Sequence, residues 1–152
     1  MKLGQTRVAQ VFRHRIYIPF RGILAKLIDK QYSVNTEGII ELNQLGISKN
    51  VGSRYETISY SNLRRIFFVA SSYNLDSFLD VGCGLGRSFV VAKQFNYKKF
   101  YGVDISPQLI KLCASNTSKL AINCNLSCCD VDEIKLPEGD LFICLIHSVA
   151  IK

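Results

Sequence analysis

The feature that most constrains this chain is a glycine-rich loop directly after a short apolar run, in FLDVGCGLGRSF at residues 78–89. The apolar run has the length of one buried strand, and it ends in the acid Asp80. Three glycines follow at alternate positions, Gly82, Gly84 and Gly86. One glycine is enough for a tight turn. We therefore expect the loop to lie against a ligand that contacts its backbone, where a Cβ atom would intrude.

The sequence around this loop predicts βαβ units and a parallel sheet, because short apolar runs alternate with helical segments. The predicted strands are SFLDVG (77–82), KKFYGVDI (98–105), NLSCCDV (125–131) and DLFICLIHSVAI (140–151). Helices are predicted over 87–96 and over 107–116, the second opened by a proline. Right-handed crossovers would bring the carboxyl ends of the strands to one edge, where ligands bind in such sheets.

Two further helices are predicted before the first strand. One covers 19–32, with Ile23, Leu24, Leu27 and Ile28 as its apolar stripe. The other is capped by Ser59 or Ser61 and ends at about residue 72. Its predicted inward residues are Leu63, Ile66, Phe67 and Ala70. Residues 34–53 are predicted to form a loop or short elements. We therefore divide the chain into a basic N-terminal helical arm, 1–53, and an α/β domain, 54–152.

The arm holds nearly all of the net charge. Residues 1–54 contain nine of the 19 Lys and Arg but three of the 12 Asp and Glu, which gives +6 of the net +7. Aromatic residues between these charges allow contact with nucleic acid or an anionic membrane. The same composition fits a solvated face beside an ordinary core. We favour the solvated face, because no specific nucleic-acid motif is present.

Composition also predicts the compartment. No stretch approaches the roughly 18 uncharged apolar residues of a membrane span, and the N-terminus lacks a signal-peptide layout. We expect a cytoplasmic protein with no transmembrane segment and with free thiols that pack as small hydrophobes. The six cysteines are residues 83, 113, 124, 128, 129 and 144. We expect no metal, since Cys124, Cys128 and Cys129 lack a second ligand pair at zinc-site spacing.

Two common cofactor loops do not fit the glycine spacing. A dinucleotide loop needs a third glycine where this chain has Arg87 or Phe89, and a P-loop needs Gly-Lys-Ser/Thr at its end. LDVGCGLGR instead resembles the first motif of class I S-adenosylmethionine-dependent methyltransferases. The resemblance implies a Rossmann-like methyltransferase fold with helices on both faces of the sheet. It also implies that Asp80 lies near the methionine amino group of the cofactor, directly or through water. The loop, Gly82 to Gly86 with Cys83, would form a backbone bed.

The acids that follow have the order of that family. Asp104 ends the second predicted strand, 18 residues after Gly86, where its carboxylate can accept both ribose hydroxyls. The resemblance implies that Ile105 packs on the adenine. It also implies that Asp130 accepts from the adenine amino group and that the Val131 N–H meets the ring. Asp132 and Glu133 stand nearby as alternatives to Asp130 if the register differs.

Upstream, RYETISY (54–60) resembles a segment that helps to cover the cofactor in a bacterial subgroup of these enzymes. Tyr55, Glu56 and Tyr60 are the candidates, and an aromatic face would attract the sulfonium. The alternative is a polar start of a helix with Tyr60 packed inward.

The resemblance extends over about residues 54–147. The family sheet has seven strands and this sequence supplies about four. We therefore expect an incomplete fold from a truncated gene. No acceptor signature is recognisable and no catalytic base can be named; His147 is either packed or catalytic. The sequence predicts a methyltransferase with an unknown acceptor. The alternatives are an inactive remnant of one, or a nucleic-acid-binding module that uses the basic arm.

Overall fold

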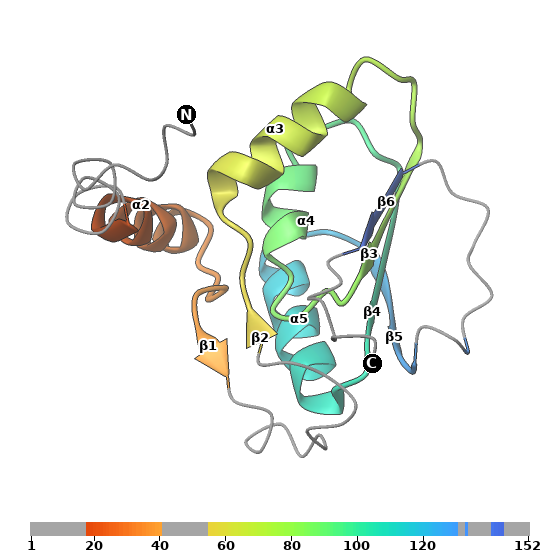
Figure 1. Ribbon diagram of the computed structural model, residues 1–152. Coiled ribbons are helices and arrows are strands. Elements are labelled where there is room, and N and C mark those ends of the chain that lie inside the picture. Colours follow the sequence, from red (N-terminus) through yellow and green to blue (C-terminus); the bar gives the residue numbers. More distant parts are fainter. Residues whose placement is uncertain (1–17, 41–54, 131–132, 134–140, 145–152) are drawn as a thin grey trace, which may run out of the picture.

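In the computed structural model, which describes residues 18–40, 55–130, 133 and 141–144, a layer of helices lies against a parallel sheet (Figure 1). The sheet has the order β5-β4-β3-β6, and each neighbouring pair is parallel. Its strands are β3 (Ser77–Val81), β4 (Lys99–Asp104), β5 (Cys124–Cys128) and β6 (Leu141–Cys144). The first three predicted strands are confirmed, and the fourth is confirmed over 141–144, while residues 140 and 145–151 of its predicted range lie outside the described residues. The third, however, begins one residue before the predicted segment and ends before Cys129.

The strand order places the glycine loop where ligands bind in such sheets. From β3 the chain moves outward through β4 to β5, then returns to the other side of β3 as β6. The order therefore reverses at β3, and the crevice of such a sheet opens at the carboxyl end of that strand. Asp80 pairs with Gly102 on β4, and Asp104 pairs with Cys128 on β5.

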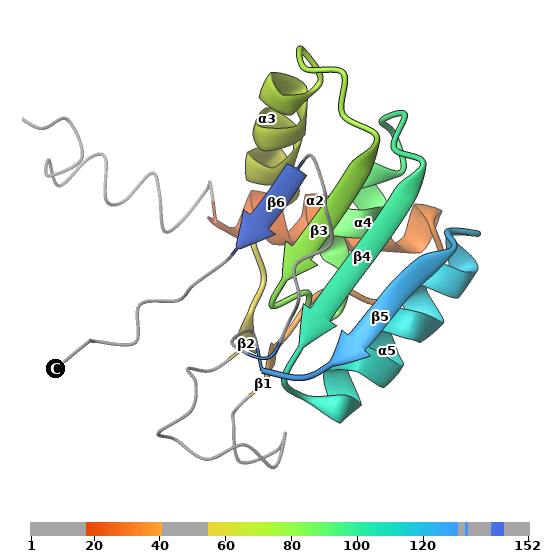
Figure 2. The ribbon, with the colours of Figure 1, turned by 90° about the vertical axis from the view of Figure 1, so that its right-hand side faces the viewer.

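Three helices cover one face of the sheet: α3 (Tyr60–Ala70), α4 (Arg87–Ala92) and α5 (Pro107–Lys119). Figure 2 shows the opposite face, on which no helix of the described residues lies. Ser59 caps α3, and Ser106 caps α5 ahead of Pro107. Each cap supplies an oxygen for backbone N–H groups that the first turn leaves unpaired. α4 ends four residues earlier than predicted, and α5 runs three residues further.

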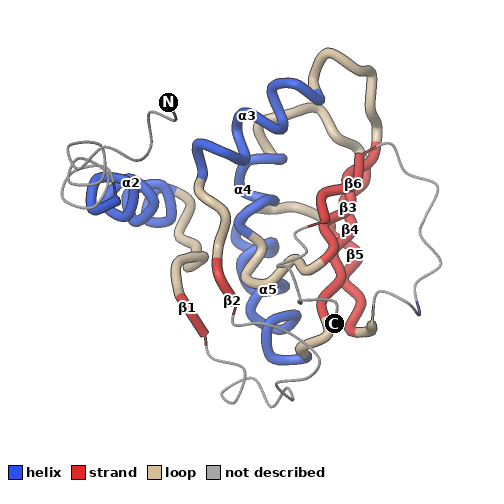
Figure 3. Tube along the Cα trace, viewed as in Figure 1, coloured by secondary structure: helices blue, strands red, loops and turns tan. Residues whose placement is uncertain are grey.

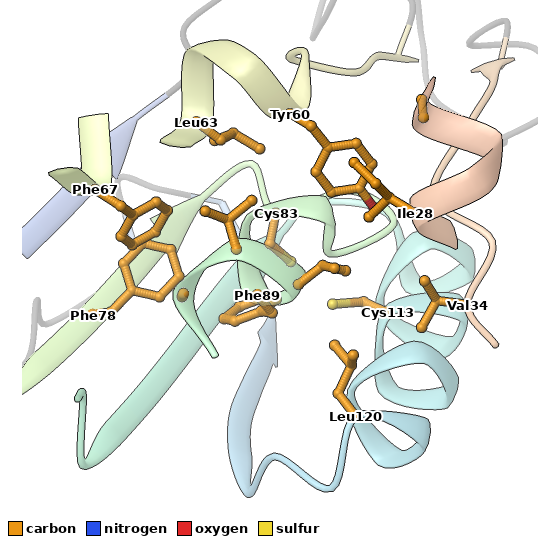
Figure 4. Packing of buried hydrophobic residues seen from close by; sticks show 14 residues of the cluster. Ile28, Val34, Tyr60, Leu63, Phe67, Phe78, Cys83, Phe89, Cys113 and Leu120 are labelled. Carbon is orange, nitrogen blue, oxygen red and sulfur yellow. The ribbon is translucent and has the colours of Figure 1, made fainter. Parts of the chain in front are cut away.

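α4 lies at the centre of the core, since all six of its residues are buried. Phe78 on β3 contacts Phe67 of α3 and Phe89 of α4 edge to face, at centroid distances of 5.1 and 5.4 Å. Figure 4 shows that these rings belong to a larger hydrophobic core, which includes Leu63 and Cys113 and reaches Ile28 and Val34 of the arm. Because α4 is buried on every side, three apolar residues (90–92) follow Phe89 without interruption. A helix at the surface would carry polar residues on its exposed face.

The arm packs on this core through one edge of α2 (Ile18–Gln31). Of its predicted apolar stripe only Ile28 is buried; Ile23 and Leu27 are each 59% exposed, and Ala25 is buried instead. Ile66 of α3 was also predicted to face inward and is exposed. These predictions were wrong because helical spacing selects an apolar face but does not tell how much of it the fold covers.

After α2 the chain forms a short ladder with the segment before α3. β1 (Ile39–Ile40) pairs antiparallel with β2 (Tyr55–Glu56). Figure 3 shows this ladder beside the helices, and Figure 2 places it at the carboxyl end of the sheet. The arm and the glycine loop therefore meet on the same side of the domain.

Candidate functional site

The glycine loop is folded directly onto the end of β4. The N–H groups of Gly82 and Cys83 both donate to the Val103 carbonyl, at 2.8 and 2.9 Å. The Gly84 N–H donates to Asp104 Oδ2 at 2.9 Å. Two elements that the sequence predicted to share a sheet edge are thus joined by hydrogen bonds.

Asp104 is a buried carboxylate that still has acceptor capacity. Its second oxygen, Oδ1, accepts the Ser106 N–H at 2.9 Å. Burial raises the pKa of Asp104, while the N–H donors of Ser106 and Gly84 oppose that rise. Each oxygen of an ionised carboxylate can accept about two hydrogen bonds. Asp104 can therefore receive further donors at the sheet edge.

All three glycines of the loop have positive φ, 79° at Gly82, 52° at Gly84 and 80° at Gly86. Residues with a Cβ adopt this region at a cost. At Gly86 an added Cβ would also lie 2.8 Å from Cys113 Sγ. Gly86 is therefore explained by its own backbone conformation and by contact with α5, without any ligand.

Asp80 is the buried acid at the end of β3. Its Oδ2 accepts from the Ser88 hydroxyl, while Oδ1 is buried with no hydrogen-bond partner among the described residues. Burial raises its pKa to about 7; the Ser88 hydrogen bond lowers it and the Asp104 charge adds to the rise. Buried polar atoms are normally paired. The arrangement suits a donor that arrives from outside the chain, such as an ammonium group or a water.

Ile105 and Asp130 lie at the same edge, beyond the ends of β4 and β5. Ile105 is 39% exposed, although it directly follows buried Asp104. Asp130 is half-buried and stands two residues after β5, and its carbonyl accepts the N–H of exposed Glu133 at 3.1 Å. The predicted positions of Val131 and Asp132, and that of His147, lie outside the described residues.

The three residues from the upstream segment are placed differently. Tyr55 and Glu56 form the backbone ladder of β2. The Tyr60 ring is buried, and its hydroxyl donates to Asp29 Oδ1 at 2.5 Å. Burial, followed by that hydrogen bond, raises the pKa of Tyr60. Tyr60 therefore packs inward at the start of its helix, as the second of the two interpretations expects, and its hydroxyl is bonded to Asp29.

Sequence reasoning missed Arg87, which directly follows the loop. This guanidinium is buried and lies over the Tyr60 ring, 4.8 Å from the ring centroid. Its Nε donates to Thr36 Oγ1 at 2.9 Å, and its Nη2 forms an ion pair with Glu37 at 2.5 Å. An arginine at the start of an otherwise apolar helix was the signal, because a buried charge needs a partner.

Sequence reasoning also missed Asn116 on α5. Its amide nitrogen donates to the carbonyls of Leu85 and Asn35, both at 2.9 Å, and its oxygen accepts the Asn35 N–H at 3.2 Å. An asparagine within an amphipathic helix carries no local signal of this role.

The cysteines within the described residues are free. Cys83 and Cys113 are buried, as predicted, and a hydrogen bond with the Cys113 thiol, followed by burial, raises the pKa of Cys83. Cys124 is half-buried against the core, whereas Cys128 is exposed and so is not the predicted buried thiol. Across the described ranges no group of three or more His, Cys, Asp or Glu could hold a metal ion. No described helix is long and apolar enough to cross a membrane.

The family comparison agrees with this geometry. Residues 78–151, just under half of the chain, match the model of a family described as a methyltransferase domain. The fold matches that of an S-adenosylmethionine-dependent methyltransferase from Clostridium acetobutylicum, with a TM-score of 0.51 and 20% identity. By sequence, residues 78–151 are similar to a methyltransferase domain, and the structural likeness shows a shared fold.

Other relatives set the extent of the likeness. An RNA methyltransferase from Salinibacter ruber, solved with S-adenosyl-L-homocysteine, has a TM-score of 0.52 and 19% identity over 59% of this chain and 60% of its own. The Clostridium match covers 57% of this chain and 37% of that one. The protein MJ0284 of Methanocaldococcus jannaschii is 28% identical over 69 residues, 45% of this chain and 32% of its own length. The chain thus spans less than two thirds of the length of each of these three relatives.

Proposed function

We propose that this chain binds S-adenosylmethionine at the carboxyl edge of its sheet and serves in methyl transfer to an acceptor that we leave unassigned. The observation that carries the proposal is the hydrogen bond from the Gly84 N–H to Asp104 Oδ2. It joins a glycine loop after the first strand to the acid that ends the second strand. Both features lie within residues 78–151, the range that matches a methyltransferase domain.

The residues at this edge fit the chemical groups of the cofactor. Asp104 keeps lone pairs for the two ribose hydroxyls, and exposed Ile105 offers an apolar surface for the adenine. Asp130, with the Val131 N–H, would meet the polar edge of that ring. At the opposite end, the unpaired Asp80 Oδ1 suits the methionine ammonium, directly or through water.

The sulfonium of the bound cofactor would supply an electrophilic methyl group for direct displacement. The contribution of this chain would be to position the cofactor and to exclude water from the loop. Asp80 would hold one end and Asp104 the other, which fixes the orientation of the molecule between them. We assign no catalytic base.

Binding of the demethylated product, S-adenosyl-L-homocysteine (SAH), to the 152-residue chain tests the proposal by calorimetry. Micromolar binding is expected for the wild type, with a loss of on the order of tenfold or more in Asp104→Asn, because an amide accepts fewer donors than a carboxylate. The matched control is Asp76→Asn, the same chemical change at an exposed acid paired with Lys98 before β3. A folded wild type that does not bind SAH, or equal binding by both variants, would contradict the proposal.

Two finer expectations belong to the same proposal. A cytoplasmic location is supported by the free thiols, which persist in reducing compartments. Nucleic acid as partner of the basic arm remains the less favoured prediction. It requires RNA or DNA binding that weakens steeply as salt increases, and binding independent of salt would reject it. An inactive remnant would differ from an enzyme in cofactor binding: it would aggregate, or stay soluble without binding SAH.

A further inference from the structure

The glycine loop is connected to the arm by a buried polar network. We define the strap as residues 34–37, which lie within the segment between α2 and β1. Thr36 is the fully buried centre of the strap, and its hydroxyl donates to Asp29 Oδ1 at 2.8 Å. The Thr36 N–H donates to the other Asp29 oxygen at 2.6 Å. These bonds fold the strap back onto the end of α2.

Two side chains then tie the strap to the loop, one at each end of the loop's last turn. Arg87 reaches the strap at Thr36 Oγ1 and at the Glu37 carboxylate. Asn116 uses the two N–H bonds of one amide group, one for the Leu85 carbonyl in the loop and one for the Asn35 carbonyl in the strap. The loop cannot shift at residues 85 and 87 without breaking contacts to the strap.

The network is built to hold one arrangement. A guanidinium offers N–H donors in a rigid planar fork, and here three separate acceptors meet it: Thr36 Oγ1, the Ile58 carbonyl and the Glu37 carboxylate. A buried cation that lost these partners would be left unpaired at high cost. The backbone of the loop, in turn, presents the Gly84 N–H to Asp104.

We propose that the strap positions the glycine loop for the cofactor, and that Arg87 and Asn116 are positioning residues that act through it. This inference rests on the proposed function, since it assigns to the arm the role of holding the glycine loop of the cofactor site in place. By linkage, if the bonded arrangement of the strap strengthens cofactor binding, the cofactor must stabilise that arrangement by the same factor.

Four variants separate this role from a merely structural one. Thr36→Val removes the hydroxyl that accepts from Arg87 and keeps the side-chain shape, while Thr36→Ser keeps the hydroxyl. Glu37→Gln removes the charge that pairs with Arg87 at a half-buried site. The matched control for the lost charge is Asp76→Asn, which breaks the exposed ion pair with Lys98.

The measurements are SAH affinity by calorimetry and amide hydrogen exchange of the free and SAH-bound chain, with circular dichroism to verify that each variant is folded. Thr36→Val and Glu37→Gln should each weaken SAH binding by on the order of tenfold, within the usual range of coupling between sites. Thr36→Ser and Asp76→Asn should bind as the wild type does. SAH should slow exchange at the Asn35 and Thr36 amides by a similar factor, and leave the Lys98 amide unchanged.

The outcomes distinguish the two proposals. A wild type that binds SAH while its strap amides exchange at an unchanged rate would overturn the strap inference alone. Wild-type affinity in a folded Glu37→Gln variant would do the same, whether or not Thr36→Val folds. A folded wild type that does not bind SAH would overturn both the strap inference and the proposed function.

Discussion

Replacing Asp80 with asparagine should make the protein more stable at pH 8 and less stable, by about 1–3 kcal/mol, at pH 4. Burial raises the pKa of this carboxyl from 3.8 to about 7. Because the folded-state pKa lies above the unfolded one, the stability is fully present below about pH 4 and is lost as pH rises through about 7. A rise of about three units in this pKa corresponds to about 4 kcal/mol in the free energy of unfolding.

The asparagine recovers only part of this energy. Its amide N–H₂ faces the same surroundings, and an unpaired buried donor costs about 1–3 kcal/mol. The variant should therefore gain about 1–3 kcal/mol over the wild type at pH 8. Integration of the wild-type titration gives a loss of about 2–3 kcal/mol between pH 5 and pH 8 that the variant should not show.

Urea unfolding of both proteins at pH 5 and pH 8, followed by circular dichroism, measures these differences. Other groups that titrate in this range cancel in the comparison between variant and wild type. Asp76→Asn, at an exposed site, should give nearly the same small difference at both pH values. If the stability difference for Asp80→Asn were also equal at pH 5 and pH 8, the carboxyl would not have the raised pKa, and the reasoning from its burial would be wrong.

Further predictions concern the site and the core. At pH 6, SAH binding should release protons, up to about one per molecule bound, because an ammonium beside Asp80 favours its ionised form; calorimetry in buffers of different ionisation enthalpy measures this. Gly86→Ala should lower the free energy of unfolding by about 2 kcal/mol or more, through its positive φ and the contact with Cys113; urea unfolding measures the loss. Phe67→Ala should lower it by about 3–5 kcal/mol, because the ring is fully buried. A thiol reagent should label exposed Cys128 well before buried Cys113, as read by mass spectrometry.

Local signals in the sequence were sufficient for the elements and their order. Pro107 directly follows the cap of α5, and the alternation of apolar runs with helical segments gave the four parallel strands. Asp80 and Asp104 were identified because each ends a strand, and parallel strands end at one edge. The glycine spacing was informative because the loop conformation needs a positive φ at each of those positions.

The limits of sequence reasoning appear at the arm and at α3. Helical spacing placed Leu27 and Ile66 inward, yet both are exposed, since burial depends on which neighbours the fold supplies. The sequence left two interpretations of Tyr60 open. A hydrogen bond to Asp29, 31 residues away, placed its ring in the core.

The sequence by itself determined a parallel sheet with an acid and a glycine loop at its carboxyl edge, because those features follow from local backbone preferences and strand periodicity. Only the tertiary structure decided what holds the loop in place. The contacts of Arg87 with Thr36 and of Asn116 with Asn35 join residues 51 and 81 positions apart. No local pattern encodes such contacts, because they form only when folding brings the arm, the loop and α5 together.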